Sequence, residues 1–153
     1  MAARVSLRSI VDAMYSQSEM ARSYLNRVTG ELIYIGYDEL LAAETGEHES
    51  LCDPDVLELA KKMLAEEDNY VLLPDQYMIN EYQIMERFAM SLPNPVLSDK
   101  VLSVMRGRGA FHRFKDIIAN LRLEQDWYDY LEREFKEIAI DWCEEHNIKY
   151  KDE

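Results

Sequence analysis

The residue types best suited to chemistry gather in one short stretch, MRGRGAFHRFKD, at positions 105–116. Arginine forms bidentate hydrogen bonds with carboxylates and phosphates, and glycine lets an anion come close to the main chain. An apolar repeat typical of a helix begins just after the two glycines, and the N-terminus of a helix favours negative charge. The stretch therefore suggests an anion site whose ligand-binding residues are Arg106, Gly107, Arg108, Gly109, His112, Arg113 and Lys115.

Each residue type has a distinct role in this hypothesis. The glycines shape the backbone, and Arg106 and Arg108 clamp the anionic group. His112, Arg113 and Lys115 tune the local charge and its response to pH. A phosphate, a carboxylate or an acidic segment of a partner protein would suit such a site.

The same residues also have a purely structural interpretation. Two glycines that tolerate positive φ suit a tight turn between antiparallel helices. Arg106 and Arg108 would then be exposed or paired with internal carboxylates. The spacing matches neither the phosphate-binding GxxxxGK[ST] loop nor a GxGxxG sequence that follows a strand. The residues alone leave both interpretations open.

No other group of residues indicates catalysis or metal binding. Cys143 and His146 form a C-x-x-H pair without the further ligands that zinc requires. The three histidines lie in separate segments, and no motif holds a serine or cysteine beside an activating base. We assign no catalytic residue, metal site or cofactor, and the sequence favours a non-enzymatic protein.

Capping signals place the helices that position these residues. A polar residue with an apolar neighbour before it and another four positions after it occurs at Ser6, Asn80 and Ser98, and Asp53 precedes a proline. We expect helices near 6–16, 54–66, 80–91 and 98–106. Apolar periodicity predicts one helix after Gly109 and a long final helix near 124–146, with its tryptophan-bearing face packed against the former.

The strands are expected in the N-terminal half. SYLNRVTGELIYIGY at 23–37 predicts a hairpin around Gly30, and NYVLLP at 69–74 predicts a third strand. The acidic part AAETGEHES at 42–50 is predicted to be an exposed loop. The fold class is therefore α+β, with a small antiparallel sheet (a hairpin plus a third strand) in the N-terminal half and a mainly helical C-terminal half.

Length and charge limit the remaining possibilities. With 153 residues, 48% of them hydrophobic, the chain suits a single domain over 1–153, made of an α/hairpin part at 1–75, a helical part at 76–148 and a frayed tail at 149–153. We expect neither a secretory signal at the N-terminus nor a membrane span, and we expect the two cysteines to be free and buried. We therefore expect a cytoplasmic protein without membrane association.

The net charge of −13 argues against broad affinity for nucleic acids, because polyanions are repelled at long range. Residues 98–122 nevertheless hold six lysines and arginines against two aspartates. Two other functions therefore stay open. The helices around Gly107 and Gly109 could form a helix-turn-helix-like nucleic-acid-binding element. Alternatively, a tyrosine- and methionine-rich surface could bind a protein partner or a second copy, using Tyr77, Met78, Tyr82, Met85 and Met90.

Several runs of residues resemble one known family. GRGAFHRFKD, WYDY and EIAIDWCEEHNI in the C-terminal half, and LRSIVDAM, YLNRVTGELI and INEYQIMERFA before them, resemble the bacterial uncharacterised protein family numbered 0158 in the UPF series. His112 stands where that family usually has an arginine. The resemblance spans nearly the whole chain and implies a small bacterial cytosolic protein, without implying an activity.

Overall fold

The chain divides into two compact units. A computed structural model describes residues 4–153, apart from the side chains of Gln76 and Tyr77. The sheet unit comprises residues 1–75 and 138–153, and the helical unit comprises residues 76–137. The first boundary coincides with the one predicted between the α/hairpin part and the helical part. A single domain over 1–153 stays a prediction, and its residues 1–3 lie outside the described part of the chain.

The sheet unit contains the predicted antiparallel sheet, so the α+β fold class is confirmed. Its strands are β2 (Ala21–Asn26), β3 (Leu32–Gly36) and β4 (Tyr70–Leu72), in the order β3-β2-β4. Tyr24 pairs with Ile33 on one side and with Leu72 on the other. Gly30 takes a φ of 79° in the hairpin turn, which is why glycine suits this position.

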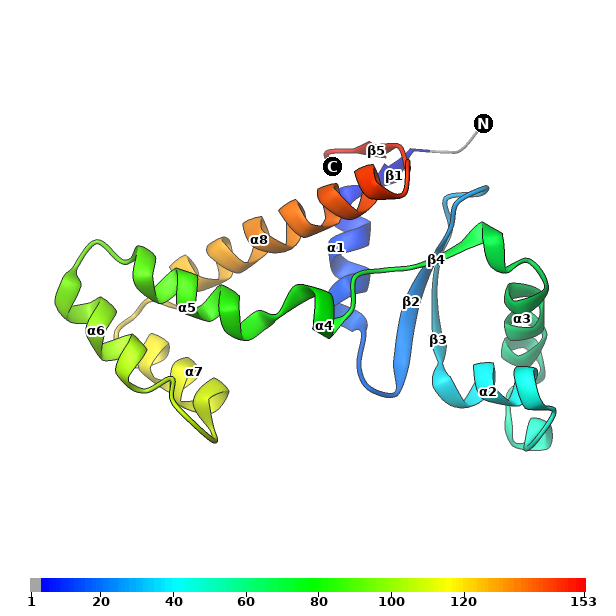
Figure 1. Ribbon diagram of the computed structural model, residues 1–153, viewed down its shortest axis with the longest axis horizontal. Helices are drawn as coiled ribbons and strands as arrows, with labels where there is room; N and C mark the ends of the chain where they lie inside the picture. Colours follow the sequence, from blue (N-terminus) through cyan, green and yellow to red (C-terminus); the bar gives the residue numbers. More distant parts are fainter. Residues whose placement is uncertain (1–3) are drawn as a thin grey trace. The chain divides into compact units, whose positions relative to one another are not determined.

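Helices cover both faces of this sheet (Figure 1). Helix α1 (Leu7–Ser16) lies on one face, where the Ser23 hydroxyl donates to the Ala13 carbonyl at 3.0 Å. Helices α2 (Tyr37–Thr45) and α3 (Pro54–Ala65) lie on the other face. Between them and the sheet, a buried apolar cluster holds Ile33, Ile35, Ala60 and Met63. Burial of this cluster fixes the two helices against the sheet.

Three of the predicted helix starts are confirmed by their capping bonds. The Ser6 side chain accepts from the Ser9 amide, and the Asp53 side chain accepts from the Asp55 and Val56 amides. Helix α5 (Glu81–Ser91) begins after Asn80, whose side chain accepts from the Gln83 amide at 3.3 Å. Local side-chain chemistry thus sets these starts before any tertiary packing is considered.

The fourth predicted start is wrong. Helix α6 spans Pro95–Ser103 instead of 98–106, because Asn94 caps it and Pro95 occupies its first turn. The Asn94 side chain accepts from the Val96 amide at 2.9 Å. Ser98 lies inside the helix and donates to the Ala89 carbonyl at 2.8 Å. Asn94-Pro95 is the stronger start signal, because Asn94 supplies a side-chain acceptor and Pro95 has no amide hydrogen that would lack a partner in the first turn.

The predicted acidic loop at 42–50 is also partly wrong. Its first four residues belong to α2, and Glu49–Leu51 forms a short 3₁₀ turn, η1. A second 3₁₀ turn, η2 (Glu67–Asn69), leads into β4. Helix α2 follows Gly36, which has no capping side chain, so its start carries no sequence signal. It ends at Gly46, whose φ is 78°.

The helical unit contains α4 (Gln76–Ile79), α5, α6, α7 (Ala110–Asn120) and the first part of α8 (Glu124–Glu145). Phe114 of α7 meets Trp127 of α8 edge-on, with ring centroids 4.8 Å apart, and Phe88 lies 5.3 Å from Trp127. The predicted packing of α8 against α7 is therefore confirmed at Trp127. The other tryptophan, Trp142, belongs to the sheet unit, where its indole N–H donates to the Leu72 carbonyl at 3.0 Å.

Fraying of the tail at 149–153 stays a prediction, and in the structure these residues pair with the segment at 5–8. Strand β5 (Tyr150–Lys151) pairs in parallel with β1 (Val5–Ser6). The Arg8 amide donates to the Glu153 carbonyl at 2.8 Å, and the Ser6 hydroxyl donates to the same oxygen at 2.5 Å. Exposed main-chain groups near both ends of the chain satisfy one another, which the side-chain pattern of the tail does not reveal. Across the described residues, no helix combines the length and apolarity needed to span a membrane.

Candidate functional site

The arginine-rich stretch forms the connection between α6 and α7, and we call residues 104–113 the basic turn. Gly107 and Gly109 take φ values of 74° and 78°. These values lie in the left-handed region that glycine adopts without strain. The predicted tight turn is therefore confirmed. Helix α7 starts directly after Gly109, and no side chain caps its N-terminus.

Arg113 holds the basic turn together. Its Nε donates to the Val104 carbonyl at 2.8 Å, and one terminal nitrogen donates to the Arg108 carbonyl at 2.5 Å. The other terminal nitrogen donates to the Arg106 carbonyl. A guanidinium group suits this arrangement because its donors diverge in one plane. The side chain predicted to tune a ligand site thus forms three bonds with the backbone of the turn.

Gly109 serves a second purpose in this arrangement. A Cβ atom at this position would come within 3.0 Å of a terminal nitrogen of Arg113. A larger residue would therefore require the guanidinium to shift slightly, in addition to the strain of its positive φ. Gly107, by contrast, has no atom within 4 Å of where its Cβ would lie, so only its φ of 74° favours glycine.

The other predicted site residues present their side chains to solvent. Arg106, Arg108, His112 and Lys115 are all exposed. Among the described side chains, Arg106 and Arg108 form no ion pair, so the internal pairing considered above is not observed there. The His112 Nε2 lies 3.3 Å from an Asp116 carboxylate oxygen one turn along α7. No described contact joins His112 or Lys115 to either arginine.

The tyrosine- and methionine-rich segment is only partly accessible. Met85 is 1% exposed, and the half-buried Tyr82 donates its hydroxyl to the Met105 carbonyl at 2.5 Å. Met78 and Met90 are 56% and 68% exposed. The Tyr77 side chain lies outside the described part of the structure. Two of the five residues suggested for an interface are thus available on the surface.

The two cysteines lie in different environments. Cys143 is buried as predicted, and burial, with the Glu144 carboxylate nearby, raises its pKa to about 11. Cys52 is only half-buried, so its predicted burial is wrong. Desolvation and the carboxylates of Glu39 and Asp38 raise the pKa of Cys52 as well. Both thiols are therefore held in the protonated, weakly nucleophilic form at neutral pH. Within residues 4–153, no three His, Cys, Asp or Glu side chains converge as metal ligands.

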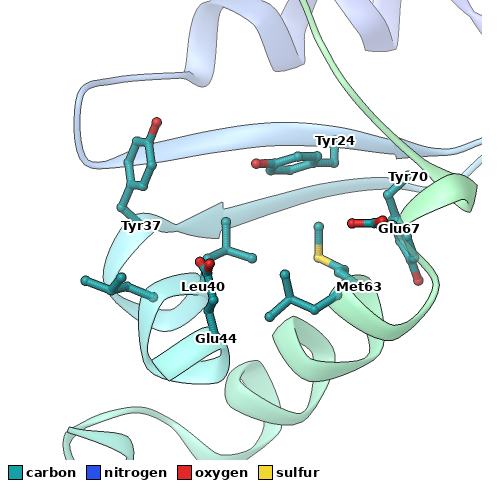
Figure 2. A pocket seen from close by; sticks show the side chains of 9 residues that line it. Tyr24, Tyr37, Leu40, Glu44, Met63, Glu67 and Tyr70 are labelled. Carbon is teal, nitrogen blue, oxygen red and sulfur yellow. The ribbon is translucent and has the colours of Figure 1, made fainter. Parts of the chain in front are cut away.

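The structure also contains a cavity that the sequence did not suggest. It lies between helices α2 and α3 and the face of the sheet that they cover, and it has a volume of about 340 Å³ (Figure 2). We call it the tyrosine cavity, and its lining consists of Tyr24, Tyr37, Leu40, Leu41, Glu44, Met63, Leu64, Glu67 and Tyr70. These residues lie in three stretches of the chain, at 24, 37–44 and 63–70, so no local motif could have indicated them. In the sequence, Tyr24 and Tyr37 belong to the predicted hairpin at 23–37 and Glu44 to the acidic part at 42–50.

Rings and carboxylates surround the apolar interior of this cavity. In Figure 2 the ring of Tyr24 lies across its sheet side, and the Glu67 carboxylate points into it. Burial, followed by the neighbouring Tyr37, raises the pKa of Tyr24, so its hydroxyl stays neutral at neutral pH. Beside the cavity, Arg22 lies 3.2 Å from Asp75 and 5.2 Å from the centre of the Tyr37 ring.

Comparison with known proteins was informative only at the level of the family. The pattern of an uncharacterised protein family (UPF0158) matches residues 3–153. No curated protein and no solved structure matches the chain.

Proposed function

Because the chain belongs to the uncharacterised protein family UPF0158, whose description assigns no activity, we propose from the geometry alone that it is a binding module whose basic turn captures an anionic group. Arg106 and Arg108 supply the charge in this proposal, and Gly107 lets the ligand approach the backbone. The observation that carries the proposal is the position of Arg113. It binds three of the carbonyl oxygens of the turn and leaves both other arginines without an ion pair among the described side chains.

The electrostatics of the turn support an anion over a cation. Carbonyl oxygens are the groups of a turn that repel an anion, and here three of them accept hydrogen bonds from a guanidinium group. The uncapped first turn of α7 adds free amide groups and the positive end of the helix dipole. The carboxylate of Asp116, which lies beside His112 on α7, offsets part of the positive charge of this region. The ligand class we propose is a phosphate-like or carboxylate group.

Ligand-induced thermal stabilisation tests this proposal. The protein is heated with inorganic phosphate, a short DNA oligonucleotide or an acidic peptide, beside the Arg106→Ala/Arg108→Ala variant. A ligand at about 100 times its Kd stabilises the fold by about 2.7 kcal/mol, which raises Tm measurably. We expect one probe to raise Tm of the wild type and not that of the variant. Stabilisation by DNA alone, weakening steeply with salt, would favour the helix-turn-helix-like alternative.

A matched charge variant provides the control. Lys62→Ala/Lys149→Ala removes the same charge from two exposed side chains of the sheet unit. It should keep the response to the probe, because neither lysine belongs to the basic turn. An equal loss of response in both variants would mean that net charge, and not the turn, attracts the anion. A complete lack of stabilisation by every probe would reject the proposal.

A further inference from the structure

The tyrosine cavity has the dimensions and the apolar interior of a small-molecule site. Its volume of about 340 Å³ lies within the range of roughly 300–1,000 Å³ typical of ligand pockets. Met63 on its inner wall is buried, and Leu40 packs against the same apolar cluster. Leu41 and Leu64, which also line it, are 57% and 38% exposed. A ligand with an apolar part would remove this surface from water.

Every charged side chain that lines the cavity is acidic. Glu44 comes from α2 and Glu67 from η2, and neither forms an ion pair among the described side chains. Arg22, which flanks the cavity at Tyr37, is already paired with Asp75. The cavity therefore presents two negative charges with no internal counter-ion, and an anionic ligand would be repelled.

The aromatic rings also favour a positively charged ligand. The face of a phenol ring attracts a cation, and the ring of Tyr37 already has the Arg22 guanidinium 5.2 Å from its centre. Tyr24 and Tyr70 contribute two further phenol rings to the cavity. We propose that the tyrosine cavity binds an organic cation, an ammonium or guanidinium group carried on an apolar stem. The stem lies against Leu40 and Met63, and the charged head lies between the carboxylates and the ring of Tyr24.

This proposal is independent of the anion-binding function. The tyrosine cavity belongs to the sheet unit and the basic turn to the helical unit, so the two sites share no residue. The cation could be a free amine, or it could be the side chain of a lysine or arginine in a partner protein. Both sources offer the same chemistry to the cavity, and separate probes distinguish them.

Titration calorimetry with matched probes tests the proposal. Butylammonium, butanol and butyrate share one stem and differ in charge. We expect butylammonium to bind with saturation, the other two to bind at least about fivefold more weakly, and binding to weaken as salt is added. A capped tripeptide with a central lysine is the second arm. Tighter binding of the peptide identifies a protein side chain as the source, and tighter binding of the free amine identifies a small molecule.

Variants locate the binding within the cavity. Glu44→Gln/Glu67→Gln changes two exposed side chains and should fold normally while weakening butylammonium binding about tenfold or more. Glu58→Gln on the exposed surface of α3, outside the cavity, is the charge control and should bind as the wild type does. Tyr24→Leu should weaken binding, whereas Tyr34→Leu, on the other face of the sheet, should not.

Three results would overturn the proposal. The first is equal binding of butanol and butylammonium, which would mean that the apolar walls alone hold the stem. The second is unchanged affinity in the Glu44→Gln/Glu67→Gln variant with circular dichroism like that of the wild type. The third is the absence of saturable butylammonium binding to the wild type.

Discussion

In the basic turn a charged side chain, that of Arg113, holds the backbone in place. In the tyrosine cavity apolar side chains hold the walls together, and the two charged side chains, Glu44 and Glu67, are exposed. Arg113 binds three carbonyls of a turn that contains two glycines and little apolar bulk. The cavity instead rests on Ile33, Ile35 and Met63, and its two glutamates take no part in that packing. One charged side chain of the basic turn, Arg113, thus has a structural role, whereas neither glutamate of the cavity contributes to the packing around it.

The largest effect on stability is expected from Met63→Ala. Met63 is 4% exposed, so its loss leaves a void in the apolar cluster and should lower the free energy of unfolding by about 2–4 kcal/mol. Urea denaturation followed by circular dichroism measures this change. Met90→Ala is the control. Because Met90 is 68% exposed, this substitution should lower the free energy of unfolding by less than about 0.5 kcal/mol. A similar loss of unfolding free energy in the two variants would contradict the view that apolar packing of Met63 supports the cavity.

A smaller loss, about 2 kcal/mol, is expected from Arg113→Ala, since three carbonyls lose their charged donor on a partly exposed surface. Arg113→Lys should restore only part of it, because an ammonium group cannot reach three divergent acceptors as a planar guanidinium does. Arg108→Ala, which removes an exposed side chain, should cost less than about 0.5 kcal/mol. Full rescue by lysine in urea denaturation would show that charge alone, and not donor geometry, maintains the turn.

The smallest effect is a dependence of stability on alkaline pH at Tyr24. Its pKa is raised above 10.0 in the folded protein, first by burial, so the native state holds this proton more tightly than the unfolded state does. The stabilisation is fully present below about pH 10 and is lost as the pH rises through the folded pKa. Urea denaturation between about pH 9 and 11 should show a shallower decline for Tyr24→Phe. Identical slopes for the two proteins would exclude Tyr24 as the source.

Much of the fold could be predicted because it depends on neighbouring residues. Ser6, Asp53 and Asn80 cap their own helices, and Gly30, Gly107 and Gly109 take the positive φ that their turns require. The start of α6 was missed because Ser98 also fits a capping pattern and was chosen over Asn94-Pro95. Helix α2 was missed because Gly36 offers no capping side chain.

The candidate sites were less predictable, for a physical reason visible in Arg113. From its charge and its place near the two glycines, Arg113 is predicted to belong to the ligand site. The turn folds back so that Val104, Arg106 and Arg108 direct their carbonyls at it. Main-chain acceptors carry no sequence signature, so this role depends on the path of the backbone.

The residues alone predict three of the capped helices, the hairpin, the α+β class and the concentration of positive charge around two glycines. Each of these follows from interactions over a few residues or from composition. The bonds of Arg113 to the backbone depend on the path of the turn, because the carbonyls that it binds have no side-chain signature. The pairing of β5 with β1 and the lining of one cavity by Tyr24, Glu44 and Glu67 join segments far apart along the chain. Main-chain hydrogen bonds make the first of these two arrangements, and apolar burial, which is not directional, brings the cavity walls together.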